Sequence, residues 1–209
     1  MNKKILYGII IPQIIFSQSL DMNEISSLSR SKAQSAFKEY REFLSLPNDA
    51  NKQDELIPNM IWCENAFQKR GFTTERLKTK RLPLILAEKK YSGAKNTVLF
   101  YIQIDGQPVD PSKWFQEGPF IPTLKKQVNN DNWETIPWES LYKNYDDDWR
   151  IFARSASDAK GPINSFLIAL DIIEEKKIQP DYNIKVIMDM EEEMGSPNLP
   201  PAVKKFRKK

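Results

Sequence analysis

Hydrophobic side chains recur with a helical period in several parts of the chain. Residues 24–45, 54–70 and 162–177 each carry apolar residues three or four positions apart, which is typical of amphipathic helices. Gly71 follows the second pattern, at a position where a helix end favours glycine. A last helix is expected over residues 199–206. The hydrophobic pattern therefore predicts two helices before residue 71 and two after residue 161.

Short apolar stretches between these helices predict strands. They are residues 72–77, 82–88, 97–104, 150–154 and 183–188. Because strands and helices alternate, we expect an α/β fold, a three-layer structure with a mostly parallel sheet flanked by helices. Residues 106–150 are rich in proline and tryptophan and look irregular. A segment of that length is either functional or contains elements that the pattern does not reveal.

The first residues have the pattern of a signal peptide. Lys3 and Lys4 precede an apolar run over residues 5–16, and small or polar residues follow it. The run is too short to span a bilayer, which takes about 20 residues. We expect a signal peptide over residues 1–17 and an exported protein, periplasmic or secreted, with no membrane attachment after cleavage. A buried strand or a retained anchor is the alternative.

The composition narrows the possible chemistry. Hydrophobic residues make up 40% and charged residues 28% of the chain, which is typical of a globular fold. The sequence has no histidine, which excludes a Ser-His-Asp triad, an HExxH zinc helix and a zinc finger. Cys63 is the only cysteine, so no internal disulfide is possible. Catalysis would have to use carboxylates, Lys, Tyr, Ser, Thr or a metal held mainly by oxygen.

The basic charge is concentrated at the ends of the chain. The formal net charge is +3, but Lys3, Lys4 and the basic tail over residues 204–209 account for the excess. The tail is most simply a solvated helix end, because no aromatic residues alternate with its basic ones. We therefore expect no nucleic-acid partner.

Acidic residues follow the predicted strands at matching positions. They are Asp105, Asp158 and the triplet 191–193. The carboxyl ends of parallel strands meet at one edge of a sheet, and carboxylates that converge there favour a divalent cation. Each has an ordinary explanation when taken alone: a turn, a helix start and a solvated run, respectively. Together they favour a site.

The segments around these acids, residues 98–114, 154–162 and 188–199, carry three ordered motifs. They resemble the co-catalytic zinc exopeptidases and deacylases, a family that includes glutamate carboxypeptidases, carnosine dipeptidases, acetylornithine deacetylases and succinyl-diaminopimelate desuccinylases. The order and spacing resemble the dipeptidase-like branch. The resemblance implies that residues 18–203 form the N-terminal part of the catalytic α/β domain.

The resemblance also implies roles for individual residues. Asp158 would bridge two metal ions, Glu193 would bind one of them, and Glu192 would be the general base. Asp105 would be an acid of the catalytic site that orients the first metal ligand. The cofactor would be a pair of Zn²⁺ ions, with Mn²⁺ or Co²⁺ as alternatives. The substrate would be a small peptide or an N-acyl amino acid, and the complete protein would be a homodimer.

The sequence departs from the family pattern in two ways. Gln103 stands where the family has a histidine ligand, and an amide oxygen is a weaker ligand for this metal position than imidazole. The chain also ends at Lys209, before the family's later ligands. We therefore expect a fragment with an incomplete fold, inactive alone, that exposes a sheet edge or an apolar face.

Two other functions remain open at this point. One is a non-catalytic binding or interaction relative with a degenerate metal site, in which the Trp-rich segment 114–149 forms a recognition surface. The other is a glycosidase that uses two carboxylates, such as Asp105 and Glu192. The residues that follow Glu193 favour the amidase family over the glycosidase.

Overall fold

A computed structural model describes residues 20–208, so the expected signal peptide lies outside the described residues. The helices are α1 (Met22–Leu44), α2 (Gln53–Gln68), α3 (Lys160–Glu175) and α4 (Leu199–Phe206). The strands are β1 (Thr73–Leu77), β2 (Leu84–Lys89), β3 (Asn96–Gln103), β4 (Thr123–Asn129), β5 (Asn132–Thr135), β6 (Arg150–Phe152) and β7 (Tyr182–Asp189). Short 3-10 helices occupy Pro111–Lys113, Trp138–Tyr142 and Glu192–Met194.

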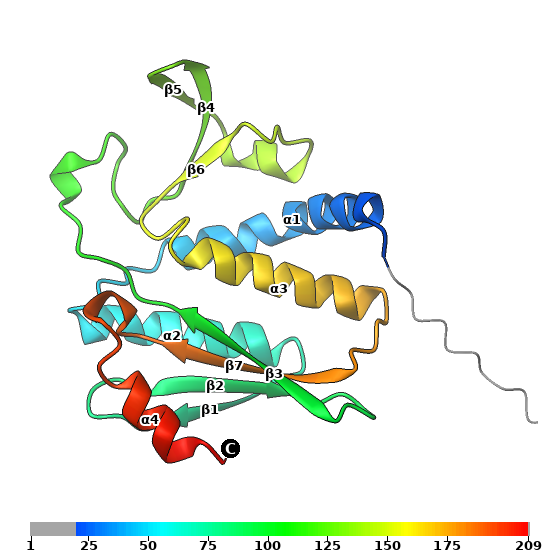
Figure 1. Cartoon of the computed structure of the whole chain (residues 1–209). Coiled ribbons are helices and arrows are strands. Elements are labelled where there is room, and N and C mark those ends of the chain that lie inside the picture. Colours follow the sequence, from blue (N-terminus) through cyan, green and yellow to red (C-terminus); the bar gives the residue numbers. More distant parts are fainter. Residues whose placement is uncertain (1–19, 209) are drawn as a thin grey trace, which may run out of the picture.

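The main sheet has the strand order β1-β2-β7-β3 (Figure 1). Strands β3 and β7 run parallel, in a register that places Val98 beside Ile184 and Gln103 beside Asp189. The chain travels between these two strands through α3, as a parallel connection requires. The α/β class is therefore confirmed.

The sheet is partly parallel, and the expectation of a mostly parallel sheet needs correction. Strand β2 pairs antiparallel with both β1 and β7. The connection from β1 to β2 covers only residues 78–83, which is too short for the crossover that a parallel pair needs. Strands β3 and β7 are thus the parallel pair of the described sheet, and they are the pair that carries acids at their ends.

Helices cover both faces of this sheet. The side chains of Ile184, Val186 and Met188 point to the face covered by α1, α2 and α3, where the largest cluster of buried residues lies. Ile187 points to the other face, where it packs with Ala202 of α4. This alternation is that of a strand buried on both sides. The result is the expected order of helix layer, sheet and helix layer (Figure 1).

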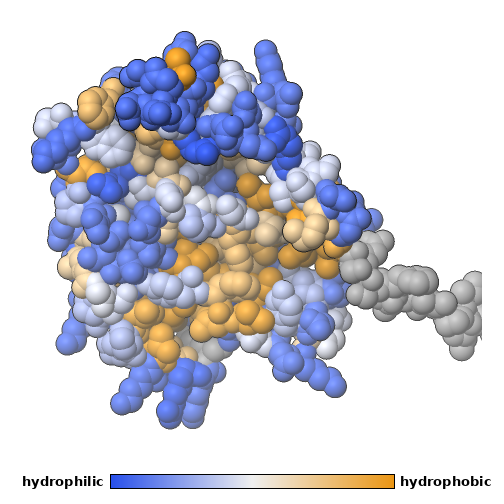
Figure 2. Space-filling model, turned by 45° about the horizontal axis from the view of Figure 1, so that its top comes forward, coloured by the Kyte–Doolittle hydropathy of each residue, from blue (hydrophilic) through white to orange (hydrophobic). Residues whose placement is uncertain are grey.

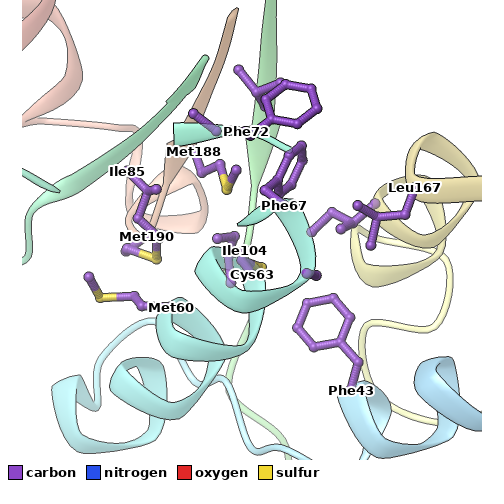
Figure 3. Packing of buried hydrophobic residues seen from close by; sticks show 14 of the residues in the cluster. Phe43, Met60, Cys63, Phe67, Phe72, Ile85, Ile104, Leu167, Met188 and Met190 are labelled. Carbon is purple, nitrogen blue, oxygen red and sulfur yellow. The ribbon is translucent and has the colours of Figure 1, made fainter. Parts of the chain in front are cut away.

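The core brings the three long helices and the sheet together (Figure 3). Phe43 of α1, Phe67 of α2 and Leu167 of α3 are at most 1% exposed and belong to one cluster. Phe43 stacks on the ring of Trp62, with ring centroids 3.8 Å apart. Burial of each such side chain contributes about 1.5–3 kcal/mol, so this cluster fixes the helices on the sheet.

Residues 106–150 contain regular elements that the hydrophobic pattern did not reveal. Strands β4, β5 and β6 form a separate antiparallel sheet in the order β5-β4-β6. Trp138 is only 4% exposed and packs with Leu124 and Leu141 in a cluster of its own. Trp133 contacts the ring of Phe152. Much of the tryptophan in this segment therefore serves packing.

Some apolar surface remains open to solvent. Strand β3 forms one edge of the main sheet and exposes Leu99 by 56% and Tyr101 by 46%. Figure 2 shows hydrophobic surface gathered across the middle of one face, with hydrophilic side chains around it.

Within residues 20–208 no helix has the length and apolar character needed to cross a membrane. Lys204 and Lys205 lie exposed in α4.

Candidate functional site

The three acid-bearing turns lie on the side of the sheet where β3 and β7 end. Asp105 follows β3, the triplet 191–193 follows β7, and Asp158 lies just before α3. Because β3 and β7 are parallel neighbours, their carboxyl ends share one edge of the sheet. Figure 1 shows this edge beside the start of α3.

Glutamine side chains connect these turns. Gln103 Nε2, at the end of β3, donates a hydrogen bond of 3.0 Å to Asp158 Oδ1. Gln107 Nε2 donates a bond of 3.0 Å to Glu193 Oε2. Both of the carboxylates expected to bind metal therefore have an amide group as their partner. The turn after β3 is thus surrounded by three of the predicted site residues, Gln103, Asp158 and Glu193.

Asp105 is buried beneath this edge. It is 0% exposed, and its Oδ2 accepts a hydrogen bond of 3.1 Å from the backbone N–H of Glu193. Burial raises the pKa of Asp105 to about 6, although the backbone N–H groups of Glu193 and Glu192 act in the opposite direction. Its Oδ1 has no hydrogen-bond partner among the described residues. Asp105 therefore holds the turn that carries Glu193.

The acidic triplet is divided between two environments. Glu191 is 2% exposed and pairs with Arg81, whose Nη1 lies 3.2 Å from Oε1. Glu192 and Glu193 are half-buried, at the start of a 3-10 helix. The triplet is thus not a solvated run. Glu192 and Glu193 remain partly exposed to solvent at this edge of the sheet.

Asp158 is exposed at the start of α3, and the residue two positions later anchors that helix. Lys160 is fully buried, and its Nζ donates to the carbonyl oxygens of Phe43 at 2.7 Å and Leu46 at 2.6 Å. Burial lowers the pKa of Lys160 to about 7. This lysine ties the start of α3 to the end of α1, and so fixes the position from which Asp158 projects.

The donor atoms at this edge are of a type that suits a divalent cation. Asp158 and Glu193 offer carboxylate oxygens, and Gln103 offers an amide oxygen if its side chain turns. Within residues 20–208, however, no group of three or more His, Cys, Asp or Glu side chains is placed to hold a metal ion. The donor chemistry fits a metal, and the described residues supply only part of a coordination shell.

Sequence reasoning missed several polar residues that support this edge. Asn48 and Ser155 are buried and bonded to each other, and Arg81 reaches the triplet from the connection between β1 and β2. Lys160 stands inside a motif that the sequence shows, but nothing in the pattern indicates that its side chain points into the core.

The chain is similar to known peptidases. The model of peptidase family M20/M25/M40 matches residues 99–208. Human beta-Ala-His dipeptidase is 31% identical over 123 residues, which make up 59% of this chain and 20% of that protein. The matched stretch thus spans one fifth of that relative.

Solved structures show the same fold. The M20 family metallo-carboxypeptidase Sso-CP2 from Sulfolobus solfataricus matches with a TM-score of 0.63 and 29% identity, over 81% of this chain and 34% of that one. Human carnosine dipeptidase 1 matches with a TM-score of 0.66 and 23% identity, over 87% of this chain and 37% of that one. The likeness to human carnosine dipeptidase 1 concerns the fold alone.

Proposed function

The chain belongs to peptidase family M20/M25/M40, and from this premise we propose that the protein hydrolyses the amide bond of a small peptide or an N-acyl amino acid. Family membership and the dipeptidase relatives support a metal-dependent peptidase, and the family implies a divalent metal ion. The chain covers well under half of these relatives, so the activity, the substrate and a homodimeric assembly are proposals for the whole protein.

The observation that carries the proposal is the hydrogen bond between Gln103 and Asp158. It joins the end of β3 to the start of α3 at 3.0 Å, at the edge where Glu193 also lies. Residues far apart in the sequence therefore meet where ligands bind to sheets of this class. The segments that carry them lie within the match to the family.

We assign roles that follow this geometry. Asp158, Glu193 and Gln103 would hold the metal, Zn²⁺ or alternatively Mn²⁺ or Co²⁺, which when bound supplies Lewis acidity toward a carbonyl oxygen. Glu192 is the general base: its carboxylate takes a proton from the attacking water and gives it to the leaving amine. Asp105 keeps the backbone of Glu193 in place.

Zinc titration of the purified chain tests the proposal. We expect Zn²⁺ binding in the unmodified chain and its loss in Asp158→Ala. Asp131→Ala is the matched control, because Asp131 is an exposed aspartate in the turn between β4 and β5. Equal binding by the unmodified chain and Asp158→Ala would remove Asp158 from the site.

We also propose that the 209-residue chain alone turns over dipeptides at no useful rate. The reason is the incomplete shell: the described residues offer too few ligands for a pair of metal ions. Dipeptide hydrolysis, assayed with added Zn²⁺, Mn²⁺ or Co²⁺, tests this expectation. Robust turnover that disappears in Glu192→Gln would refute it and would support the role of Glu192.

A second candidate is a binding protein with a degenerate metal site. It is favoured by the orientation of the Gln103 amide, which donates N–H to Asp158 rather than offering oxygen. Trp114 and Trp149 line a cavity of about 780 Å³ that could serve recognition. Absence of metal binding at every tested concentration would favour this candidate over the hydrolase.

We further propose that the protein is exported. The support is the sequence of residues 1–17, with its basic start and apolar run. Cell fractionation and N-terminal sequencing of the mature protein test this, and an intact N-terminus in the cytoplasmic fraction would contradict it.

A further inference from the structure

A segment outside the acid-bearing turns, residues 48–50, contacts two of them directly. Asn48 is 0% exposed, and its Nδ2 donates to the carbonyl oxygen of Ile104 at 2.9 Å and to Ser155 Oγ at 3.0 Å. Ile104 directly precedes Asp105, and Ser155 lies three residues before Asp158. One buried amide therefore joins the turn after β3 to the turn before α3.

The backbone of this segment reinforces the contact. Gly106 N–H donates to the carbonyl oxygen of Asn48 at 2.8 Å, and Ala50 N–H donates to the carbonyl oxygen of Gly106 at 2.9 Å. A Cβ atom on Gly106 would lie 2.5 Å from Ser155 Oγ. A side chain at position 106 would therefore force Ser155 or Asn48 to shift.

Arg81 connects the same segment to the third turn. Its Nη2 donates to the carbonyl oxygen of Ala50 at 2.7 Å, and its Nη1 donates to Glu191 Oε1 at 3.2 Å. Asn198 Nδ2 donates to Glu191 Oε2 at 2.6 Å. Both carboxylate oxygens of Glu191 are therefore engaged inside the protein, at 2% exposure. Glu191 is thus not free to bind a metal or to act as a base.

We propose that Asn48, Arg81 and Glu191 are positioning residues, which hold the three acid-bearing turns against residues 48–50 and so set the spacing of Asp158 and Glu193. The proposal rests on the proposed function for its consequence in metal binding. The claim that these residues hold the three turns rests on the contacts alone.

The physical reason lies in burial. A buried carboxylate that loses its cationic partner retains the full cost of desolvation, and the chain can relieve that cost by moving the group into water. For Glu191 this means opening of the turn formed by residues 191–198. That turn carries Glu192 and Glu193, and its Glu193 N–H would leave Asp105 at the same time.

Hydrogen exchange followed by mass spectrometry tests the structural part on the full chain. In Arg81→Met we expect exchange in peptides that cover residues 190–198 to be about tenfold faster or more, with peptides from α2 unchanged. The matched control is Arg76→Met, which removes an arginine of β1 that pairs with Glu64 of α2, away from the turn. Unchanged exchange over residues 190–198 in Arg81→Met would overturn the proposal.

A gentler variant covers the case in which Arg81→Met fails to fold. Asn198→Ala removes only the hydrogen bond to Glu191 Oε2. It should change exchange in the same peptides and in the same direction, by a smaller factor. No change in a folded Asn198→Ala protein, together with no change in Glu191→Gln, would also overturn the proposal.

Zinc affinity tests the functional part. We expect Arg81→Met to bind Zn²⁺ about tenfold more weakly than Arg76→Met, which is the size of effect seen when residues behind a metal ligand are lost. Faster exchange with unchanged zinc affinity would overturn the positioning role. If the unmodified chain binds no zinc, the proposed function loses its support, while the exchange result still decides whether these residues hold the turn.

Discussion

Replacement of Gln103 by histidine is the sharpest test of the candidate site. In the structure, Gln103 Nε2 donates to Asp158 Oδ1 at 3.0 Å, so this bond competes with a cation for that oxygen. Histidine restores the residue type that the family resemblance implies, and imidazole is a good ligand for zinc. We expect Gln103→His to bind Zn²⁺ more tightly than the unmodified chain.

The competing hydrogen bond gives the scale of the gain. The bond between Gln103 and Asp158 is solvent-exposed, and its net value is about 0.5–1.5 kcal/mol. Release of this competing bond alone corresponds to about a two- to tenfold gain in affinity. Direct coordination by the imidazole adds to that factor.

The assay is zinc titration by calorimetry on a tag-free chain, because the sequence itself has no histidine and an affinity tag would dominate the signal. Gln127→His is the matched control, since it places one imidazole on the exposed part of β4. Affinity in Gln103→His that does not exceed that of Gln127→His would refute the reasoning, because the imidazole would then gain nothing from Asp158.

Other predictions concern the core and the support of the site. Phe67→Ala should lower the free energy of unfolding, measured in urea, by about 3–5 kcal/mol, because Phe67 is fully buried between Phe72 and Phe166. A decrease below about 1 kcal/mol, which is typical of an exposed site, would contradict this packing. Gly106→Ala should cost about 1–3 kcal/mol, since its Cβ would lie 2.5 Å from Ser155 Oγ, and an unchanged melting temperature would disprove that contact. Burial raises the pKa of the Cys63 thiol, so a thiol reagent at pH 8 should react only after unfolding; rapid reaction of the folded chain would show that Cys63 is accessible.

The long elements could be predicted from sequence because they bury a regular stripe of side chains. The second predicted helix, over residues 54–70, corresponds to α2, and the predicted strand 97–104 corresponds to β3. The ribbon of β4 and β5 is not visible in the hydrophobic pattern because it is short and both faces of β4 carry polar residues, such as Lys126 on one face and Gln127 on the other. Without an apolar alternation there is no period to detect.

The residues of the candidate site also fall into two groups, those that the sequence predicts and those that it does not. Asp105 and the triplet could be found because each follows an apolar strand of the main sheet, which is a local pattern, whereas Asp158 follows β6, a short strand of the other sheet. The residues that hold them could not: Asn48 bonds to Ser155 across 107 positions, and Arg81 bonds to Glu191 across 110. Loop residues with distant partners leave no periodic signal. The triplet also gives no sign that Glu191 is buried while its two neighbours stay at the surface.

The place of β7 in the sheet has a consequence for synthesis on the ribosome. It lies between β2 and β3, yet it follows β3 by 86 positions, as the pairing of Asn96 with Tyr182 shows. While a nascent chain is being made, β2 and β3 therefore have no strand to join them until residues 182–189 emerge. Contacts so distant in sequence form slowly. The nascent polypeptide thus exposes unpaired edges of β2 and β3 until residues 182–189 have emerged, and unpaired strand edges promote aggregation.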